Sequence, residues 1–223
     1  MNEPSRAVGE LLASRVAAAG LTLDGAVADL LEQYFRLLAH WNKRINLTAL
    51  PLENPTESAL DRLFIEPLVA ADSVLAGAVS WVDLGSGGGS PAIPMKILKP
   101  AVTLIMVESK SRKAAFLREA VRELGLEGAS VAELRFEDFS RDATMRESAD
   151  VVTVRAVRPD QTAFGTAGRL LRPSGRLALF ASSDAPQSSI SGDFAVAETM
   201  KLTATAGLAI YRRRNVPRGT VII

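Results

Sequence analysis

From residue 79 onward, short apolar runs alternate with longer segments whose apolar residues recur at helical spacing, and this alternation leaves few possible folds. It predicts strands at residues 79–84, 102–107, 130–134, 151–154 and 176–180, with helices at 91–98, 110–124 and 159–171. Strands joined through helices run parallel, and right-handed crossovers cover both faces of their sheet. We therefore predict an α/β fold with a doubly wound sheet.

The first 70 residues carry only the helical pattern. Apolar residues repeat at Val8, Leu11, Leu12 and Val16, and again at Val27, Leu30, Leu31, Phe35 and Leu38. Asp24 is a candidate N-cap, and residues 54–56 are expected to open a third helix with Pro55 in its first turn. We expect a helical extension over 1–75 and a sheet domain over 76–223, with a loop at 184–193 and late strands at 208–211 and 220–223.

Composition excludes several kinds of chemistry. The chain has no cysteine and one histidine, His40, so disulfides, thiolate metal sites and histidine-rich metal sites are not expected. The 26 basic and 25 acidic residues nearly cancel, so a polyanionic partner must bind to a local patch. Acids near the N-terminus and the lack of a long apolar stretch indicate a cytoplasmic protein without a membrane anchor.

A glycine-rich turn follows the first predicted strand, in the sequence Asp83-Leu84-Gly85-Ser86-Gly87-Gly88-Gly89-Ser90-Pro91. Glycines at 85, 87 and 89 allow a sharp turn and a close approach of a ligand to the backbone. The next helix, expected to begin at Ser90 or Pro91, would offer free N–H groups. Ligands of open parallel sheets bind beyond the carboxyl ends of the strands, so we predict a small-molecule site here.

The residues of the turn limit the kinds of ligand that can bind there. A dinucleotide motif requires a third glycine where Ser90 stands, and the Gly-Lys-Ser/Thr of a P-loop is absent. Asp83 would repel a pyrophosphate, but it can order the loop or pair with the ammonium of a methionine-type cofactor. This pattern favours S-adenosylmethionine.

Acids also follow the next two strands. Glu108 ends the second strand, 23 positions after Gly85, where it suits the hydroxyls of a ribose. Phe136 and Glu137 follow the third strand, where a ring and an acceptor suit a stacked, hydrogen-bonded adenine. The predicted cofactor-binding set is Asp83, Gly85, Ser86, Gly87, Gly89, Ser90, Glu108, Ser109, Phe136, Glu137 and Arg155.

Five sequence blocks resemble one known family. They are Trp41-Asn42-Lys43-Arg44-Ile45-Asn46-Leu47-Thr48, the glycine turn continued through Ala92-Ile93-Pro94, Glu108 to Arg118, Arg135-Phe136-Glu137 and Val154-Arg155-Ala156. Their order is similar to that in the glucose-inhibited division protein B family, GidB, also called RsmG. The resemblance covers roughly residues 25–180.

The resemblance implies a Rossmann-like fold of the class I S-adenosylmethionine-dependent methyltransferase type. It also implies transfer of a methyl group to N7 of a guanosine in 16S ribosomal RNA, with the RNA or the small ribosomal subunit as partner. We expect no metal and a monomer. Positions matching the family's cofactor contacts are Gly85, Ser90, Phe136, Glu137 and Arg155. Departures from the family pattern occur at Leu63, Pro67, Ala92 and Ala181.

Two further predictions concern the reaction itself. Arg155, at the tip of the fourth strand, is the candidate catalytic residue, orienting the cofactor or the base, although capping a helix or a surface ion pair is the structural alternative. Basic residues cluster at Lys110, Arg112, Lys113, Arg118 and Arg122, at Arg155, Arg158, Arg169, Arg172 and Arg176, and at Lys201, Arg212, Arg213, Arg214 and Arg218. Together they would form a rim for an RNA backbone.

Three functions therefore compete. The first is the RNA methyltransferase, and the second is a cofactor- or RNA-binding module of the same fold that has lost turnover through the pocket departures. The third, a nicotinamide-dependent oxidoreductase, is disfavoured by Ser90. Trp41 has two possible roles as well, stacking on an unpaired base or anchoring a helix in the core.

Overall fold

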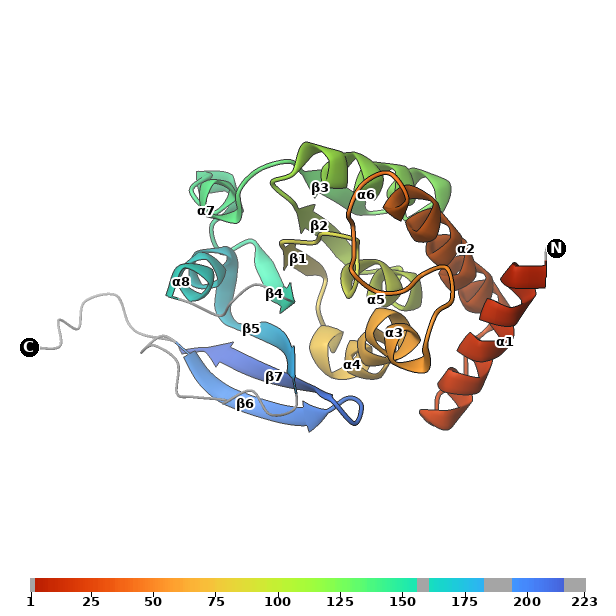
Figure 1. Ribbon diagram of the computed structural model, residues 1–223. Coiled ribbons are helices and arrows are strands. Elements are labelled where there is room, and N and C mark those ends of the chain that lie inside the picture. The colour runs from red at the N-terminus through yellow and green to blue at the C-terminus, as the bar shows by residue number, and fades with distance from the viewer. Residues whose placement is uncertain (1–2, 156–160, 183–193, 215–223) are drawn as a thin grey trace, which may run out of the picture.

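A seven-stranded sheet forms the centre of the protein (Figure 1). The computed structural model describes residues 3–155, 161–182 and 194–214. The strand order is β3-β2-β1-β4-β5-β7-β6, in which β7 runs antiparallel to both of its neighbours. The strands are β1 Ser80–Leu84, β2 Thr103–Val107, β3 Ala129–Ala132, β4 Ala149–Arg155, β5 Leu171–Ser182, β6 Phe194–Lys201 and β7 Ala206–Arg213.

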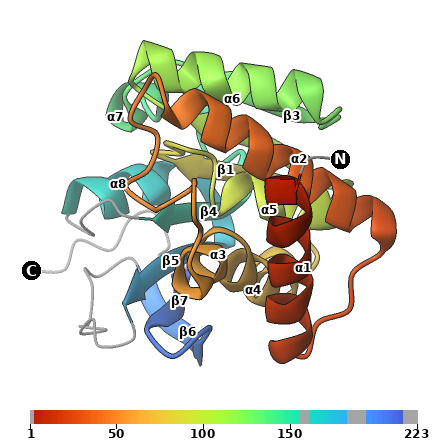
Figure 2. The ribbon, with the colours of Figure 1, turned by 45° about the vertical axis from the view of Figure 1, so that its right-hand side comes forward.

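Helices cover both faces of the sheet. They are α1 Glu3–Ala18, α2 Gly25–Asn42, α3 Glu57–Leu60, α4 Glu66–Leu75, α5 Ala92–Leu98, α6 Ser111–Glu123, α7 Phe136–Phe139 and α8 Gln161–Leu170. Figures 1 and 2 show α7 and α8 on one side of the sheet and α2, α4, α5 and α6 on the other. The predicted doubly wound α/β fold is confirmed.

Each face of the sheet carries its own apolar core, because alternate residues of a strand point to opposite faces. Trp81 and Val151 belong to the core beneath α2, α4, α5 and α6, whereas their neighbours Val82 and Val152 belong to the core beneath α8. Successive side chains of a strand point to opposite faces, so each buried strand needs apolar residues at every position. This requirement explains the continuous apolar runs in the sequence.

The N-terminal helices pack into the first of these cores. Helix α2 buries Leu31, Tyr34, Phe35 and Leu38, as its periodicity predicts. Asp24 caps it as predicted, and its side chain accepts a hydrogen bond of 2.7 Å from the Ala26 N–H. The expectation for Pro55 is wrong, because the Thr56 side chain caps α3 and the helix begins at Glu57. A hydroxyl at that position satisfies a free helical N–H, which proline cannot do.

Several elements differ from the sequence predictions. The helix after the glycine turn begins at Ala92 rather than at Ser90 or Pro91. Strand β6 and the short helix α7 were not predicted, and a π-helical turn, Asp61–Ile65, joins α3 to α4. The predicted loop at 184–193 and strand at 220–223 lie outside the described residues. Within the described residues, the structure has no helix with the length and apolar character needed to cross a membrane.

The order of the strands defines where a ligand can bind. Strand β1 pairs with β2 on one side and with β4 on the other. The chain first adds β2 and β3 on one side of β1 and then crosses to its other side to form β4, with all these strands parallel. In open α/β sheets such a crossing leaves a crevice beyond the carboxyl ends of these strands. The glycine-rich turn lies at the carboxyl end of β1 and therefore at this crevice.

Candidate functional site

A cavity of about 290 Å³ opens at this crevice, close to the lower limit of about 300 Å³ for small-molecule pockets. The sheet side supplies the glycine turn, Glu108 at the end of β2, and Arg155 at the end of β4. The helical extension supplies the facing wall. The lining residues are Leu38, Leu47, Thr48, Leu50, Arg62, Leu63, Gly85, Ser86, Gly87, Gly88, Ser90, Glu108, Lys113 and Arg155.

Backbone hydrogen bonds hold the glycine turn in place. The Gly85 N–H donates to the Val107 carbonyl at 2.8 Å, and the buried Tyr34 hydroxyl donates to the Gly88 carbonyl at 2.6 Å. Gly89 has φ +92°, and a Cβ atom there would lie 2.5 Å from Cδ1 of Ile93. Only glycine adopts this backbone without strain, so the turn needs glycine at 89 for its shape rather than for contact with a ligand.

Glu108 lies on the floor of the cavity and is 7% exposed. Its Oε2 accepts a hydrogen bond of 2.9 Å from the Gly87 N–H, and its Oε1 accepts one of 2.8 Å from the Lys110 N–H. Each carboxylate oxygen has a second lone pair. The carboxylate therefore joins the glycine turn to the start of α6 and still has acceptor capacity for ligand hydroxyls.

Asp83 lies below the turn, 1% exposed, and does not line the cavity. The Thr153 hydroxyl donates to its carboxylate at 2.5 Å and accepts from the Trp81 indole N–H at 2.8 Å. Burial raises the pKa of Asp83 to about 6, and the nearby charge of Glu108 adds to this, although hydrogen bonds from Ser86 and Thr153 oppose it. In this structure Asp83 orders the tips of β1 and β4.

Arg155 links the sheet to the helical extension. Its Nη1 donates to the Arg62 carbonyl at 2.8 Å and to the Ser90 hydroxyl at 2.9 Å, and its Nη2 forms a buried ion pair with Glu66. Burial and, to a smaller extent, the positive charge of Arg62 lower the pKa of Arg155 to about 9, so the guanidinium remains charged at neutral pH. The ring of Phe180 lies 5.0 Å from the guanidinium carbon.

The π-helical turn supplies the acceptors for these contacts. The Glu66 N–H donates to the Asp61 carbonyl, and Pro67 has no N–H to donate. The carbonyls of Arg62 and Leu63 therefore lack the helical donors expected at 66 and 67. Arg155 bonds to the Arg62 carbonyl and the Ser90 hydroxyl to the Leu63 carbonyl, at 3.0 Å, so the missing proline donor is compensated from the sheet side.

The facing wall is formed by the loop after α2. The Asn42 side-chain oxygen accepts hydrogen bonds from the N–H groups of Leu47 and Thr48, at 2.9 and 3.0 Å, which closes the loop over the glycine turn. Trp41 is half-buried and packs edge-on against Phe116 of α6, with ring centroids 5.9 Å apart. This packing favours the anchoring role for Trp41.

Not every predicted site residue reaches the cavity. The structure brings Gly85, Ser86, Gly87, Ser90, Glu108 and Arg155 together on its lining. Five others do not line it: Asp83, Gly89, Ser109, Phe136 and Glu137. Phe136 and Glu137 form the first turn of α7, so their contact with an adenine stays a prediction.

Sequence reasoning missed the contribution of the helical extension. Arg62 and Leu63 carry no local motif of a binding site, and Lys113 was noted only as one cation of a cluster. The block from Trp41 to Thr48 was a usable signal, because an asparagine that ends a helix commonly fixes the following loop with its side chain. Of the four family departures, only Leu63 lines the cavity.

The described residues contain no group of three or more histidine, cysteine, aspartate or glutamate side chains arranged to hold a metal ion. The polar groups on the lining are those suited to an organic ligand: backbone amides, hydroxyls, one carboxylate and three cations. Apolar side chains of leucine supply the rest of the wall. This mixture is typical of a site for a nucleoside-like molecule.

Comparisons with known proteins agree with this site. The family model for rRNA small subunit methyltransferase G, GidB, matches residues 28–200. Ribosomal RNA small subunit methyltransferase G of Xanthomonas axonopodis pv. citri is 41% identical over 158 residues, 70% of this chain and 69% of that protein. The protein of the same name from Stenotrophomonas maltophilia (strain K279a) is 41% identical over 161 residues, covering 71% of each chain.

Solved structures share the fold at low sequence identity. A candidate O-methyltransferase from Klebsiella pneumoniae has a TM-score of 0.55 and 14% identity, over 86% of this chain and 91% of that one. A candidate methyltransferase from Escherichia coli has the same TM-score and identity, over 75% and 92%. The glycine turn, the switch point and the matched sequence together show that the chain belongs to the rRNA small subunit methyltransferase G (GidB) family.

Proposed function

We propose that this protein transfers the methyl group of S-adenosylmethionine to N7 of a guanosine in 16S ribosomal RNA. Family membership supports the reaction class and the class of RNA. The observation that carries the proposal is the cavity at the β1–β4 switch point, whose floor combines the glycine turn with the Glu108 carboxylate. This combination fits a nucleoside with a free ribose and no phosphate.

The residues present fit that cofactor. Gly85, Ser86 and Gly87 expose backbone to the cavity, and Glu108 offers two anchored oxygens to the ribose hydroxyls. Phe136 and Glu137, at the start of α7, would contact the adenine. A dinucleotide is disfavoured by Ser90, which stands where its binding motif requires a third glycine.

The reaction requires little proton chemistry from the protein. When bound, S-adenosylmethionine supplies an electrophilic methyl group on a sulfonium centre. N7 of guanine carries a lone pair and no proton, so no general base is needed. Holding two reactants in line contributes about 7–11 kcal/mol to a barrier reduction. The rigid glycine turn and the wall formed by Leu47, Thr48 and Leu63 would supply this alignment.

Arg155 acts in this proposal as a positioning residue. Its terminal nitrogens bond to the Arg62 carbonyl, to Ser90 and to Glu66, so it holds the π-helical wall against the glycine turn. We further propose that the protein acts in the cytoplasm as a monomer on small-subunit RNA, free or assembled.

A labelled-methyl assay tests the proposal. Purified protein is incubated with labelled S-adenosylmethionine and with small-subunit RNA or small subunits that lack this methyl group. Label in N7-methylguanosine supports the proposal. Cofactor binding measured by calorimetry without any transfer, to free RNA or to subunits, would instead favour a binding module that has lost turnover.

A further inference from the structure

Two cations on the cavity lining have no acidic partner. Arg62 is exposed and Lys113 is half-buried, and among the described side chains neither forms an ion pair. Of the other charges on the lining, Arg155 pairs with Glu66, and Glu108, which accepts two backbone N–H groups, contributes one negative charge against the two cations. The cavity therefore carries an excess of positive charge at Arg62 and Lys113.

On helix α6 the cations that have no ion pair among the described side chains lie only in the first turn, next to the cavity. Beyond the first turn of that helix, Arg118 pairs with Glu133 at 2.9 Å and Arg122 pairs with Glu119 at 2.8 Å. If these cations served only solubility, unpaired and paired cations would not be separated between the cavity end and the far end of one helix. The charge of Arg62 also lowers the pKa of Arg155, so the two guanidinium groups repel each other without a ligand.

The cofactor cannot neutralise both cations. S-adenosylmethionine carries a sulfonium, an ammonium and one carboxylate, so its own net charge is positive. At most one of the two side chains can meet that carboxylate, and the bound cofactor increases the positive charge of the site. An anionic group of the substrate would be attracted to this positive charge.

The two cations lie on opposite sides of the cavity. Arg62 belongs to the π-helical turn next to α3, whereas Lys113 lies in the first turn of α6. In Figures 1 and 2, α3 and α6 lie on either side of the loop that follows α2. An RNA strand that presents a base to the cavity must cross this opening with its backbone on both sides.

We propose that Arg62 and Lys113 bind the RNA phosphates that flank the target nucleotide and thereby position its base over the methyl group. This inference rests on the proposed function, and it names two substrate-positioning residues for it. Lys110 and Arg112, both exposed on the same turn of chain, extend the positive strip beyond Lys113. Phosphate contacts of this kind set the register of a nucleic acid without reading its sequence.

Salt-dependent RNA binding tests the inference. Arg62→Gln and Lys113→Gln are compared with wild type for binding to small-subunit RNA, free and in isolated subunits, over a series of salt concentrations. Loss of one phosphate contact reduces the slope of log K against log salt by about 1 and weakens binding to all RNA sequences alike. We expect the KM for RNA to rise about fivefold, with partial rescue in Arg62→Lys and Lys113→Arg.

Two controls separate the possible outcomes. Lys99→Gln removes a cation that pairs with Asp72 away from the cavity lining, and it is expected to leave the slope of log K against log salt unchanged. Calorimetry with S-adenosylmethionine is expected to give the wild-type Kd for both variants. Weaker cofactor binding in Arg62→Gln or Lys113→Gln, with an unchanged RNA slope, would overturn the inference and assign the cation to the cofactor carboxylate.

If Arg62→Gln and Lys113→Gln change neither the salt slope of RNA binding nor the Kd for S-adenosylmethionine, the inference is overturned as well. The proposed function fails separately, when wild-type protein binds RNA but transfers no methyl group; the binding comparison then still decides the role of the two cations.

Discussion

Arg155 and Glu66 form a buried ion pair between the end of β4 and the start of α4. Both side chains are below 9% exposed, and Arg155 also bonds to Ser90 and to the Arg62 carbonyl. An ion pair in such a place requires both partners, because a single buried charge is much more costly than none. The wall of the cavity therefore depends on this pair.

Glu66→Gln leaves the Arg155 charge buried without its partner. We expect the free energy of unfolding to fall by about 3 kcal/mol, measured by urea denaturation with an unchanged m-value. Glu119→Gln, which breaks an exposed pair with Arg122, is the matched control and is expected to lower the free energy of unfolding far less. Equal losses in the two variants would contradict the structural role of the pair.

Asp83 makes stability depend on pH. Its pKa is raised from 3.8 to about 6, so the folded protein holds a proton that the unfolded chain releases between these values. The stabilisation that the protonated Asp83 gives the folded protein is complete below the pKa of this group in the unfolded chain. It is lost as the pH rises through about 6.

Asp83→Asn removes this group while keeping an acceptor for Thr153. Between about pH 3.5 and about pH 7.5, wild type is expected to lose about 3 kcal/mol of stability relative to the variant. Denaturant titrations of both proteins across this range measure the difference. A difference that does not change with pH would show that the pKa of Asp83 is the same in the folded and the unfolded protein.

The residues of the glycine turn and Glu108 could be predicted because their chemistry is local: a turn and an acid directly after a strand. Arg62 could not be predicted, because its place in the cavity depends on a helical extension that folds back over the sheet. Only the family resemblance, and no local pattern, pointed to Leu47 and Leu63. Glu66 and Pro67 act through the π-helical turn, whose geometry no sequence period indicates.

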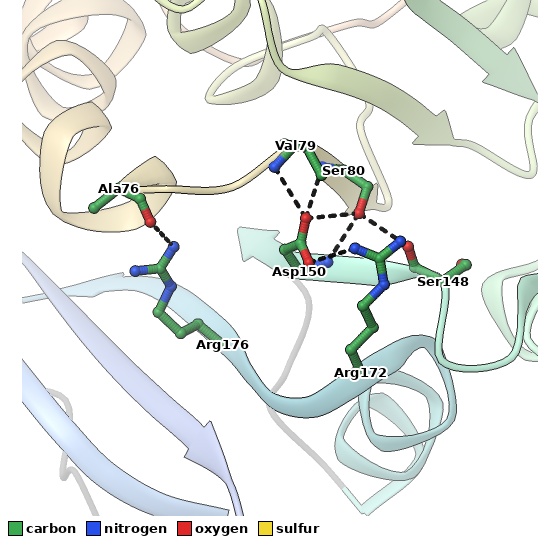
Figure 3. A network of polar contacts seen from close by, with 7 residues as sticks. All are labelled: Ala76, Val79, Ser80, Ser148, Asp150, Arg172 and Arg176. Atoms are coloured by element: carbon green, nitrogen blue, oxygen red, sulfur yellow. Dashed lines mark hydrogen bonds and ion pairs between the residues drawn. The ribbon is translucent and has the colours of Figure 1, made fainter.

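At the scale of elements, a polar network joins the amino ends of β1, β4 and β5, away from the cavity (Figure 3). The Asp150 carboxylate accepts hydrogen bonds of 2.9 Å from the N–H groups of Val79 and Ser80 and pairs with Arg172 at 2.6 Å. Arg176 donates to the Ala76 carbonyl, which ties the end of α4 to β5. The network fixes the connection between the helical extension and the sheet.

Asp150→Ala is expected to lower the free energy of unfolding by about 1–2 kcal/mol, because it removes the hydrogen bonds to the N–H groups of Val79 and Ser80, which water can replace only in part. Burial alone would raise the pKa of Asp150, but the hydrogen bonds from Val79 and Ser80 and the charge of Arg172 hold it below its usual value. This contribution is therefore present at neutral pH and is lost as the pH falls below about 4.

Methyl transfer by folded Asp150→Ala protein, assayed well below its melting temperature, is expected to match wild type, since the network lies at the opposite end of the strands. A loss of cofactor affinity in the folded variant would contradict this separation of stability from function.

Buried elements were easier to predict than edge elements. Strands β1, β2 and β4 are covered on both faces and read as apolar runs, so their positions are confirmed within one or two residues. Strand β6 lies at the edge of the sheet and buries only Phe194. Without two covered faces its sequence has only a short apolar run, residues 194–197, followed by mostly polar residues, which explains why the strand was not predicted.

At the scale of the whole molecule, the helical extension and the sheet share one apolar core. Leu31 and Phe64 belong to the same buried cluster as Trp81 and Leu104. The cavity lies at the edge of this shared core, with walls from both parts. The division at residues 75 and 76 stays a prediction about domains.

Because both parts line the cavity, a bound cofactor is expected to stabilise the whole fold. At a free S-adenosylmethionine concentration 100 times its Kd, the free energy of unfolding should rise by about 2.7 kcal/mol. Glu108→Gln has one carboxylate oxygen fewer for the ribose, and we expect its Kd to rise about tenfold, with a smaller thermal shift. Thermal unfolding with and without the cofactor measures both effects. Equal shifts in the two proteins would contradict the role of Glu108.

The proposed reaction modifies one guanosine, and mass spectrometry of small-subunit RNA from cells detects that modification. RNA is compared from cells with this gene, without it, and with the Glu108→Gln form in its place. We predict that one N7-methylguanosine is present with the gene, absent without it, and reduced in the variant strain. The same N7-methylguanosine content in the strains with and without the gene would contradict the claim.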